Sequence, residues 1–466
     1  MNTPRRTFLK QVTALGALMG ATPGMAKAVV DLQSEGDLFK AGVGVRDITP
    51  LEPVPMWGYS DTVRNGETTL DPLHAKAVVF ACGAVKVALV VMDLGRVPLA
   101  VMQNRIRAVV AKDGIQQVIF QATHTHSAPY MELPGLPHLD HVEQKITEAI
   151  LAGNDNLQEA HVALDRPTID IAHNRRLMKD GVCYMLWRNE ERRPTAPVDH
   201  EAGVLRIDGA DGKPMVTLVQ YACHPVVFGS DSKHYSADWA GAMCAGVKDA
   251  TGSECIFMQG GAGDINPYLD KTPLAAGGIE AMRGLGKEAA DVVIASYKKM
   301  KPAAPAAPQV AYKEVQVDVG LRFDIENPVQ REILDGIYGP MVDVYMKPFA
   351  KNPVVPLGAL VLNKDVAFAF TSGELFVQFQ MDLKARSPLA NSFLCGYAQD
   401  FHAYFPTVRA AAEGGYGAST VSFVGLGAGD KLVTEATVLI GQLLGEFKPV
   451  MEPEEFMLHE MDEYPA

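Results

Sequence analysis

Short apolar runs rich in Val, Ile and Phe recur along the chain, and most of them predict buried β-strands. The predicted strands cover residues 77–81, 85–92, 118–122, 216–222, 255–258, 360–362, 366–370 and 392–395. Several of the segments between them have the apolar spacing of helices. The predicted helices cover residues 99–112, 141–151, 237–249, 280–298 and 432–447.

The alternation of strands and helices predicts an α/β fold in which a mixed sheet core is flanked by helices. Antiparallel pairing is expected where two runs lie only a few residues apart, as at 360–370. Pro and Ala dominate residues 301–308, and this composition predicts a stiff extended connection between two halves of one domain or between two domains. We expect the folded domain at residues 29–450 and an acidic surface tail at residues 451–466.

The composition is that of a globular protein, with 466 residues, 48% of them hydrophobic, and a formal charge of −13. Lys and Arg form no clustered run. Because a negative chain repels phosphate, a nucleic-acid partner of the usual kind is excluded and a strongly anionic lipid surface is disfavoured.

Residues 1–28 have the features of a twin-arginine export signal. Arg5 and Arg6 stand in a basic segment, residues 12–19 form a short apolar stretch, and Ala26-Lys27-Ala28 resembles a cleavage site. These features predict a periplasmic or secreted protein that binds the twin-arginine translocase during export. Because the apolar stretch is too short to span a bilayer, we expect no stable membrane anchor after signal cleavage.

The six cysteines are scattered, lie mostly inside apolar runs and include no C-x-x-C pair. We interpret them as buried thiols, with one incidental disulfide as the alternative.

Polar side chains that can bind a metal stand just past the ends of several predicted strands. His124 and His126 follow one strand, and His224, Asp264 and Glu374 each follow another. In an open α/β sheet, ligands bind in the crevice outside the carboxyl ends of the strands, where loops can bring side chains together. We therefore expect these groups to form one site.

The H-T-H segment places two imidazoles on the same face of an extended chain. Either one ring binds a metal while the other holds a substrate oxygen or a water, or both rings are ligands; a structural pair is the alternative. Two imidazoles and one carboxylate are a usual ligand set of a catalytic zinc ion (Zn²⁺), which keeps one position open for water. No P-loop, G-x-S-x-G or dinucleotide motif indicates another mechanism.

Two glycine-rich segments need separate interpretations. Residues 259–267 either present N–H groups to a developing oxyanion or form a tight connection. Residues 425–430 fit neither nucleotide-binding pattern and predict a turn followed by the start of a helix.

Three motifs give the chain a family resemblance. They are A-G-V-G-V-R-D-I-T-P at residues 41–50, T-H-T-H-S-A-P at residues 123–129 and G-D-I-N-P at residues 263–267. In type and order they resemble the catalytic domain of neutral (non-lysosomal) ceramidases, over nearly all of the chain after residue 28. The T-H-T-H-S-x-P segment is the most specific of the three.

The resemblance implies a set of site residues. It implies a zinc ion bound by His124, His224, Glu374 and Tyr404. It also implies substrate-side roles for His126, for Arg175 in the pair Asn174-Arg175, and for Tyr416, the second of two paired tyrosines. We expect Asp264 to orient the glycine-rich loop.

The chain departs from the family pattern in two respects. The family carries Ser where this chain has Asn266, and an amide cannot act as a nucleophile. Zinc-bound hydroxide is therefore the expected attacking group, with Asn266 holding a carbonyl or hydroxyl. The family also continues into an immunoglobulin-like C-terminal domain, which we expect this chain to lack.

These observations predict an exported zinc hydrolase that cleaves an amide (N-acyl) bond of a small molecule, such as an N-acylated lipid or sugar. One alternative keeps the zinc and changes the bond to an ester, a lactone or a glycan-linked group. The other is a non-catalytic periplasmic binding or structural protein with the same fold.

Overall fold

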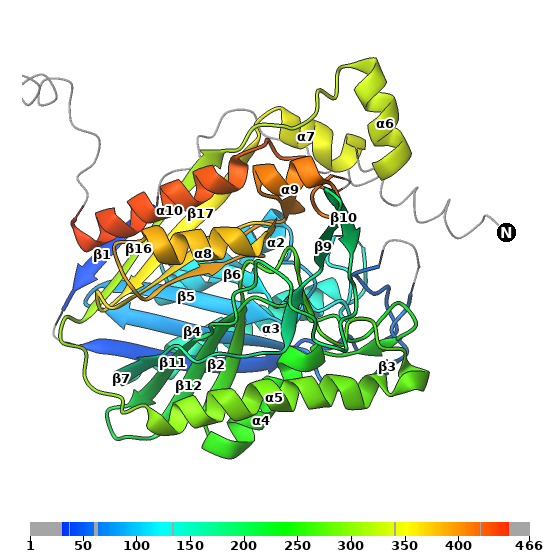
Figure 1. Cartoon of the computed structure of the whole chain (residues 1–466). Coiled ribbons are helices and arrows are strands. Elements are labelled where there is room, and N and C mark those ends of the chain that lie inside the picture. The colour runs from blue at the N-terminus through cyan, green and yellow to red at the C-terminus, as the bar shows by residue number, and fades with distance from the viewer. Residues whose placement is uncertain are drawn as a thin grey trace, which may run out of the picture.

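The computed structural model describes residues 30–36, 38–59, 64–132, 135–339, 342–419 and 421–446. Two large sheets form the centre of the molecule (Figure 1). The first has eight strands, in the spatial order β14 (Glu254–Gln259), β12 (Pro214–Tyr221), β11 (Gly203–Gly209), β7 (Gln158–Asp165), β2 (Phe39–Asp47), β4 (His74–Cys82), β5 (Val85–Met92) and β6 (Gln117–Ala122). The second has five strands, in the order β1 (Val30–Glu35), β16 (Gln309–Asp318), β17 (Val354–Leu362), β18 (Val366–Thr371) and β20 (Ser392–Cys395).

Both sheets are mixed. The pairs β5–β6, β12–β14 and β18–β20 are parallel, and the other neighbours are antiparallel. The predicted α/β class with a mixed sheet core flanked by helices is therefore confirmed.

Helices cover the outer faces of the two sheets, which pack against each other through their inner faces (Figure 1). The described helices are α2 (Ala100–Val110), α3 (Leu139–Asp155), α4 (Asp238–Thr251), α5 (Gly278–Lys299), α6 (Pro328–Tyr338), α7 (Lys347–Ala350), α8 (Val377–Arg386), α9 (Val408–Glu413) and α10 (Ala428–Leu444), with 3₁₀ turns at Ala111–Asp113 and Leu274–Ala276 and a π turn at Val342–Met346. α2 to α5 lie on the eight-stranded sheet, and α8 and α10 lie on the five-stranded sheet.

The continuous apolar runs of the sequence are strands with two buried faces. In β5, Val87 and Leu89 pack toward the five-stranded sheet, whereas Ala88 and Val90 pack toward α2 and α3. Alternate side chains of a strand point to opposite faces, so a strand between two covered faces needs apolar residues at every position.

All eight predicted strands and all five predicted helices are present, with boundaries that differ by a few residues. The predicted helix at 141–151, for example, is the longer α3, and α10 begins directly after Gly427, as the second glycine-rich segment predicted. Residues 301–308 run from α5 to β16 and connect two halves that share one core.

Short strands connect the loops around the ends of the two sheets. They are β3 (Thr68–Thr69), β8 (Ala172–Asn174), β9 (Arg176–Lys179), β10 (Val182–Met185), β13 (His234–Tyr235), β15 (Ile265–Pro267), β19 (Glu374–Leu375) and β21 (Tyr404–Phe405). They pair as β3–β13, β8–β15, β9–β10 and β19–β21.

All six cysteines are free; five are buried and Cys183 is partly exposed, so the predicted thiols are confirmed and the alternative disulfide is absent. Within the described ranges, no helix combines the length and the apolar character that crossing a bilayer requires. The predicted export signal (1–28) and the predicted tail (451–466) lie outside the described residues.

Candidate functional site

The candidate site lies where strands of both sheets end. His124 follows β6, His224 follows β12 and Glu374 follows β18. His124 has a φ of 68°, in the left-handed region that residues other than glycine rarely adopt. Such strain persists only where the surrounding structure imposes it, and it is common at functional sites.

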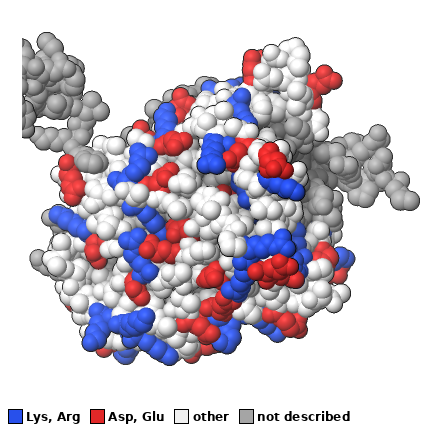
Figure 2. Space-filling model, in the orientation of Figure 1, with Lys and Arg blue, Asp and Glu red and all other residues white. Residues whose placement is uncertain are grey.

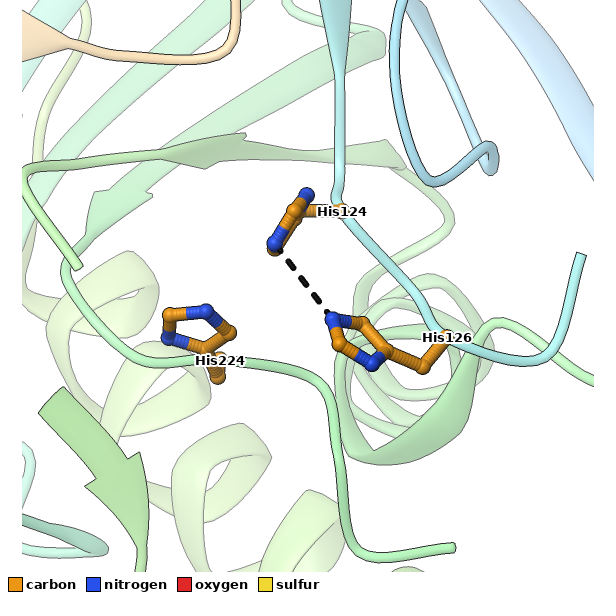
Figure 3. A group of neighbouring side chains, drawn as sticks. All are labelled: His124, His126 and His224. Atoms are coloured by element: carbon orange, nitrogen blue, oxygen red, sulfur yellow. Dashed lines mark hydrogen bonds between the residues drawn. The ribbon is translucent and has the colours of Figure 1, made fainter. Parts of the chain in front are cut away.

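Three imidazoles meet at this point, as Figure 3 shows. One potential ligand atom from each of His124, His126 and His224 lies within 4.8 Å of the other two. Nε2 of His126 is 3.4 Å from Nε2 of His124. His124 and His224 are fully buried, whereas His126 is partly exposed. Both rings of the H-T-H segment therefore reach the same point.

Backbone carbonyls fix the tautomer of the two buried rings. Nδ1 of His124 lies 2.6 Å from the carbonyl oxygen of Gly95, and Nδ1 of His224 lies 3.0 Å from that of Ile265. Because a carbonyl only accepts, each Nδ1 carries the proton and donates it. Each ring therefore turns its Nε2 to the centre of the site, the nitrogen with which a neutral ring binds a metal.

The carboxylate of Glu374 completes the inner group. Its Oε2 is 3.1 Å from Nε2 of His224 and 3.3 Å from Nε2 of His124. Burial lowers the pKa of His224 to about 4 despite the contact with Glu374, so the ring is neutral at pH 7. The contact between His224 and Glu374 then joins two acceptors, which is unfavourable in a buried site unless a cation lies between them. The donor set of two nitrogens and one carboxylate oxygen fits a divalent metal.

Tyr404 lies on the Glu374 side of the site, because β19 and β21 pair in parallel with Glu374 opposite Tyr404. Its ring is 5.5 Å from the ring of Tyr416. The guanidinium carbon of Arg175 is 5.5 Å from the centre of the Tyr404 ring and 5.3 Å from that of Tyr416. The structure thus brings the two predicted tyrosines and the predicted arginine together; Tyr404 as a metal ligand stays a prediction.

Asn266 is fully buried and bonded on both sides of its amide. Its Oδ1 accepts from Nη1 of Arg175 at 3.2 Å, and its Nδ2 donates to Oδ2 of Asp270 at 2.8 Å. Nη2 of Arg175 donates to the carbonyl of Gly263 at 2.6 Å. These bonds fix the orientation of the Arg175 guanidinium.

Asp264 orients the same region. Its Oδ1 accepts from the N–H of Val377 at 2.9 Å, and its Oδ2 accepts from Nδ2 of Asn174 at 2.7 Å. Its carbonyl accepts from the N–H of Arg175 at 2.9 Å. Asp264 therefore joins the glycine-rich loop to the first residue of α8 and to the Asn-Arg segment.

The glycine-rich segment 259–267 is a tight connection. The N–H groups of Gly260, Gly261 and Gly263 all donate to acceptors of the protein. A Cβ on Gly263 would lie 2.4 Å from the carbonyl oxygen of Glu374. Glycine is needed here because the loop contacts the backbone of a site residue.

Two tryptophans of the site had no signal in the sequence, whereas Tyr397 stands just past the end of the predicted strand at 392–395. The ring of Trp57 lies 5.0 Å from those of both His124 and His126, and the ring of Tyr397 lies 4.2 Å from that of His124. Trp187 lies 5.4 Å from Tyr416. Single aromatic residues in loops carry no periodicity, so only long-range packing shows where they lie.

Comparisons with known proteins concern the family and the fold. Residues 39–271, half of the chain, match the family model described as neutral/alkaline non-lysosomal ceramidase, N-terminal. The fold is similar to the crystal structure of neutral ceramidase from Pseudomonas aeruginosa, with a TM-score of 0.68 and 17% identity over 89% of this chain and 76% of that chain. A structure of ceramidase complexed with C2 gives a TM-score of 0.66 and 17% identity over 89% and 77% of the two chains.

Proposed function

Because the chain belongs to the neutral/alkaline non-lysosomal ceramidase family, we propose that it is a zinc-dependent hydrolase that cleaves an amide (N-acyl) bond of a small molecule, such as an N-acylated lipid or sugar. The observation that carries the proposal is the convergence of two imidazole nitrogens and one carboxylate oxygen, all buried, at distances of 3.1 and 3.3 Å.

His124, His224 and Glu374 would hold the metal, with Tyr404 as the further ligand. A bound divalent cation supplies Lewis acidity to the scissile carbonyl and lowers the pKa of coordinated water. The three sequence motifs at residues 41–50, 123–129 and 263–267 resemble those of neutral ceramidases, and this resemblance favours an N-acyl bond over an ester.

The protein's own groups have distinct roles in this proposal. His126 is partly exposed, and burial together with His124 and His224 lowers its pKa, so it is neutral at pH 7 and would accept a proton at Nε2. Arg175 and Tyr416 would stabilise the negative charge that develops on the carbonyl oxygen. Asn266 and Asp264 hold Arg175, so we assign them positioning roles.

The test combines metal analysis with a substrate panel. Purified protein should contain one zinc per chain and should hydrolyse short-chain N-acyl amides faster than matched esters, lactones or acetylated sugars. The His124→Ala variant should lose both zinc and activity, while His161→Ala, a histidine on β7, should keep both.

The outcomes separate the alternatives. Faster turnover of an ester, lactone or glycan substrate would support the alternative of a zinc hydrolase that cleaves that bond instead of an amide. Zinc binding without any turnover would favour a binding protein, and protein without stoichiometric metal would contradict the proposal.

We also propose that the chain is exported through the twin-arginine pathway to the periplasm or beyond. Six free thiols suit a protein that folds in a reducing compartment before translocation. Replacing Arg5 and Arg6 by Lys should leave the protein in the cytoplasm with its signal uncleaved, as cell fractionation would measure; unchanged export would contradict the proposal.

A further inference from the structure

Tyr397 follows β20 and lies beside the inner residues of the candidate site. It is 1% exposed, and its φ of 56° falls in the left-handed region that a bulky side chain rarely adopts. His124 has the same rare conformation, with a φ of 68°. Such strain persists only where the surrounding structure imposes it, so the packing around the site holds both residues in place.

The backbone of Tyr397 connects the two strand ends that carry His124 and Glu374. Its N–H donates to the carbonyl of Gly373 at 3.1 Å, and its carbonyl accepts from the N–H of Ala122 at 3.1 Å. Gly373 directly precedes Glu374. Ala122 is the last residue of β6 and stands two residues before His124. Tyr397 is therefore fixed relative to one donor from each sheet.

The ring of Tyr397 packs on the imidazole of His124. The centres of these two rings are 4.2 Å apart and their planes form an angle of 37°, whereas the ring of His224 lies 6.3 Å away. The ring of Trp57 also contacts the imidazole, at 5.0 Å. Because the carbonyl of Gly95 holds Nδ1 of His124, these aromatic contacts leave the imidazole little freedom to rotate.

The hydroxyl of Tyr397 is buried beside the carboxylate of Glu374. In the described ranges no group meets the geometry of a full hydrogen bond with this hydroxyl, and Glu374 is the acceptor next to it. Burial, with a smaller contribution from the charge of Glu374, raises the pKa of Tyr397 well above its ordinary value, so the hydroxyl keeps its proton at pH 7. A buried hydroxyl without a partner is costly, and a carboxylate accepts such a donor readily.

Glu374 has an oxygen to accept this donor. Its shortest contacts with the imidazoles of His124 and His224 are both made by Oε2. The other carboxylate oxygen, Oε1, can therefore accept a proton donor without competing with the contacts at the centre of the site.

We propose that Tyr397 is a positioning residue of the metal site, whose ring fixes the His124 imidazole and whose hydroxyl donates to the Glu374 carboxylate. This role rests on the proposed function, because it presumes a metal at His124, His224 and Glu374. Partners behind the ligands orient them, and the loss of one such partner weakens metal binding about 10- to 100-fold. Tyr397 would support two ligands from two different sheets.

Tyr397→Phe tests the hydroxyl alone, because the ring that packs on His124 remains. Zinc-loaded full-length protein is titrated with a chromophoric chelator, and the transfer of zinc gives the dissociation constant. We expect this constant to rise about tenfold or more, with an unchanged circular dichroism spectrum. Tyr397→Leu, which also removes the ring, should weaken zinc binding further.

A spectroscopic readout tests the position of the ligands directly. Protein loaded with Co²⁺ in place of zinc absorbs visible light according to the geometry of its ligands. The spectrum of Tyr397→Phe should differ from that of wild type, because the Glu374 carboxylate has lost a fixed partner. This measurement needs no substrate and no turnover.

Tyr297→Phe is the matched control. Tyr297 is also a buried tyrosine, 6% exposed near the end of α5, where the guanidinium carbon of Arg206 lies 3.8 Å from its ring centre. The substitution removes the same hydroxyl group from a different part of the fold. Its zinc affinity and its Co²⁺ spectrum should match those of wild type.

Zinc bound on the surface would obscure these affinities, and the charge distribution gives little reason to expect it. Figure 2 shows acidic and basic side chains interspersed over the face it presents, with no broad acidic area. Divalent metals bind where several donor side chains converge. We therefore expect tightly bound zinc to report the buried residues of the site.

An unchanged dissociation constant in Tyr397→Phe overturns the proposal. Equal losses of affinity in Tyr397→Phe and Tyr297→Phe would indicate general damage to the fold and overturn it as well. Wild-type protein that binds no divalent metal would overturn the role of Tyr397 together with the metal site. Zinc binding that Tyr397→Phe weakens, without turnover of any amide, would support the role of Tyr397 and contradict the proposed amide cleavage alone.

Discussion

The inner and outer parts of the candidate site differ in how firmly the protein holds them. The inner part, His124, His224 and Glu374, is at most 3% exposed, and backbone carbonyls fix both rings. The outer part includes Tyr416, which is 39% exposed, and Trp187, which packs on other side chains.

This difference separates two tasks. Groups that hold a metal need geometry fixed within fractions of an ångström, and burial with backbone partners provides it. Groups that meet a substrate tolerate exposure and side-chain adjustment. We therefore expect changes in the inner part to abolish the chemistry and changes in the outer part to alter substrate binding.

The largest effect is expected for Glu374→Gln, which keeps the shape of the side chain and removes its charge. Loss of an outer partner of a metal ligand costs up to about 100-fold, so loss of the carboxylate itself should lower kcat/KM by more than that. Elemental analysis should show loss of metal. Glu288→Gln, which alters an exposed carboxylate on α5, serves as the control; retention of metal in Glu374→Gln would remove Glu374 from the ligand set.

A stability effect is expected from Asp238, buried at the start of α4 behind the inner part. Burial raises its pKa to about 7 although the N–H groups of Val227, Phe228 and Trp239 donate to it. The folded protein thus binds the proton of Asp238 more tightly than the unfolded chain does. The contribution of protonated Asp238 to the free energy of unfolding is therefore complete below pH 4 and is lost as pH rises through 7. A shift of this size corresponds to at most about 4 kcal/mol.

The Asp238→Asn variant tests this contribution. Its free energy of unfolding should lack the decline between pH 4 and pH 7 that wild type shows, as urea titrations at a series of pH values would measure. Asp249→Asn, a change at an exposed carboxylate near the other end of α4, should leave the Asp238 component in place. Parallel pH profiles of wild type and Asp238→Asn would contradict the assignment.

Arg175→Lys should separate the inner from the outer part. Lysine keeps the charge but cannot donate to both Asn266 and Gly263 from a planar fork, so kcat/KM for a soluble amide should fall about 10- to 100-fold with metal content unchanged. Arg176→Lys, at the adjacent arginine that contacts α9, should change turnover little. Equal losses in both variants would indicate a structural effect.

The smallest effect is expected for Trp187→Ala. Removing a ring that packs on Arg175 and Tyr416 should raise KM about 3- to 10-fold and leave kcat nearly unchanged. Steady-state kinetics would measure both constants. A fall in kcat at constant KM would instead place Trp187 in the chemical step.

The parts of the fold that could be predicted were those with continuous apolar runs, because strands buried on both faces leave a signal at every position. β2 was not predicted, since Gly42 and Gly44 lower strand propensity. The structure explains these glycines, because a Cβ at either position would come within 2.2 Å of a carbonyl oxygen of α3. β16 was also missed. Partly exposed polar residues in its second half, such as Lys313 and Glu314, interrupt the apolar pattern.

The inner part of the site could be predicted because its residues stand at strand ends, where position alone brings His124, His224 and Glu374 together. Trp57 and Trp187 could not be predicted in the same way, because they lie in loops. The hydrogen bonds of Asn266 with Arg175 and Asp270 depend on side-chain packing between separate segments, which the local sequence does not encode.

The donors of the inner part come from both halves of the molecule. His124 and His224 extend from the eight-stranded sheet, and Glu374 follows a strand of the five-stranded sheet. Before the two sheets pack together, the three donors are not in one place and cannot bind a metal ion together. A bound metal would therefore indicate that the two halves have packed. In the proposed twin-arginine export, which carries folded proteins, metal loading would then mark the molecules that are ready for transport.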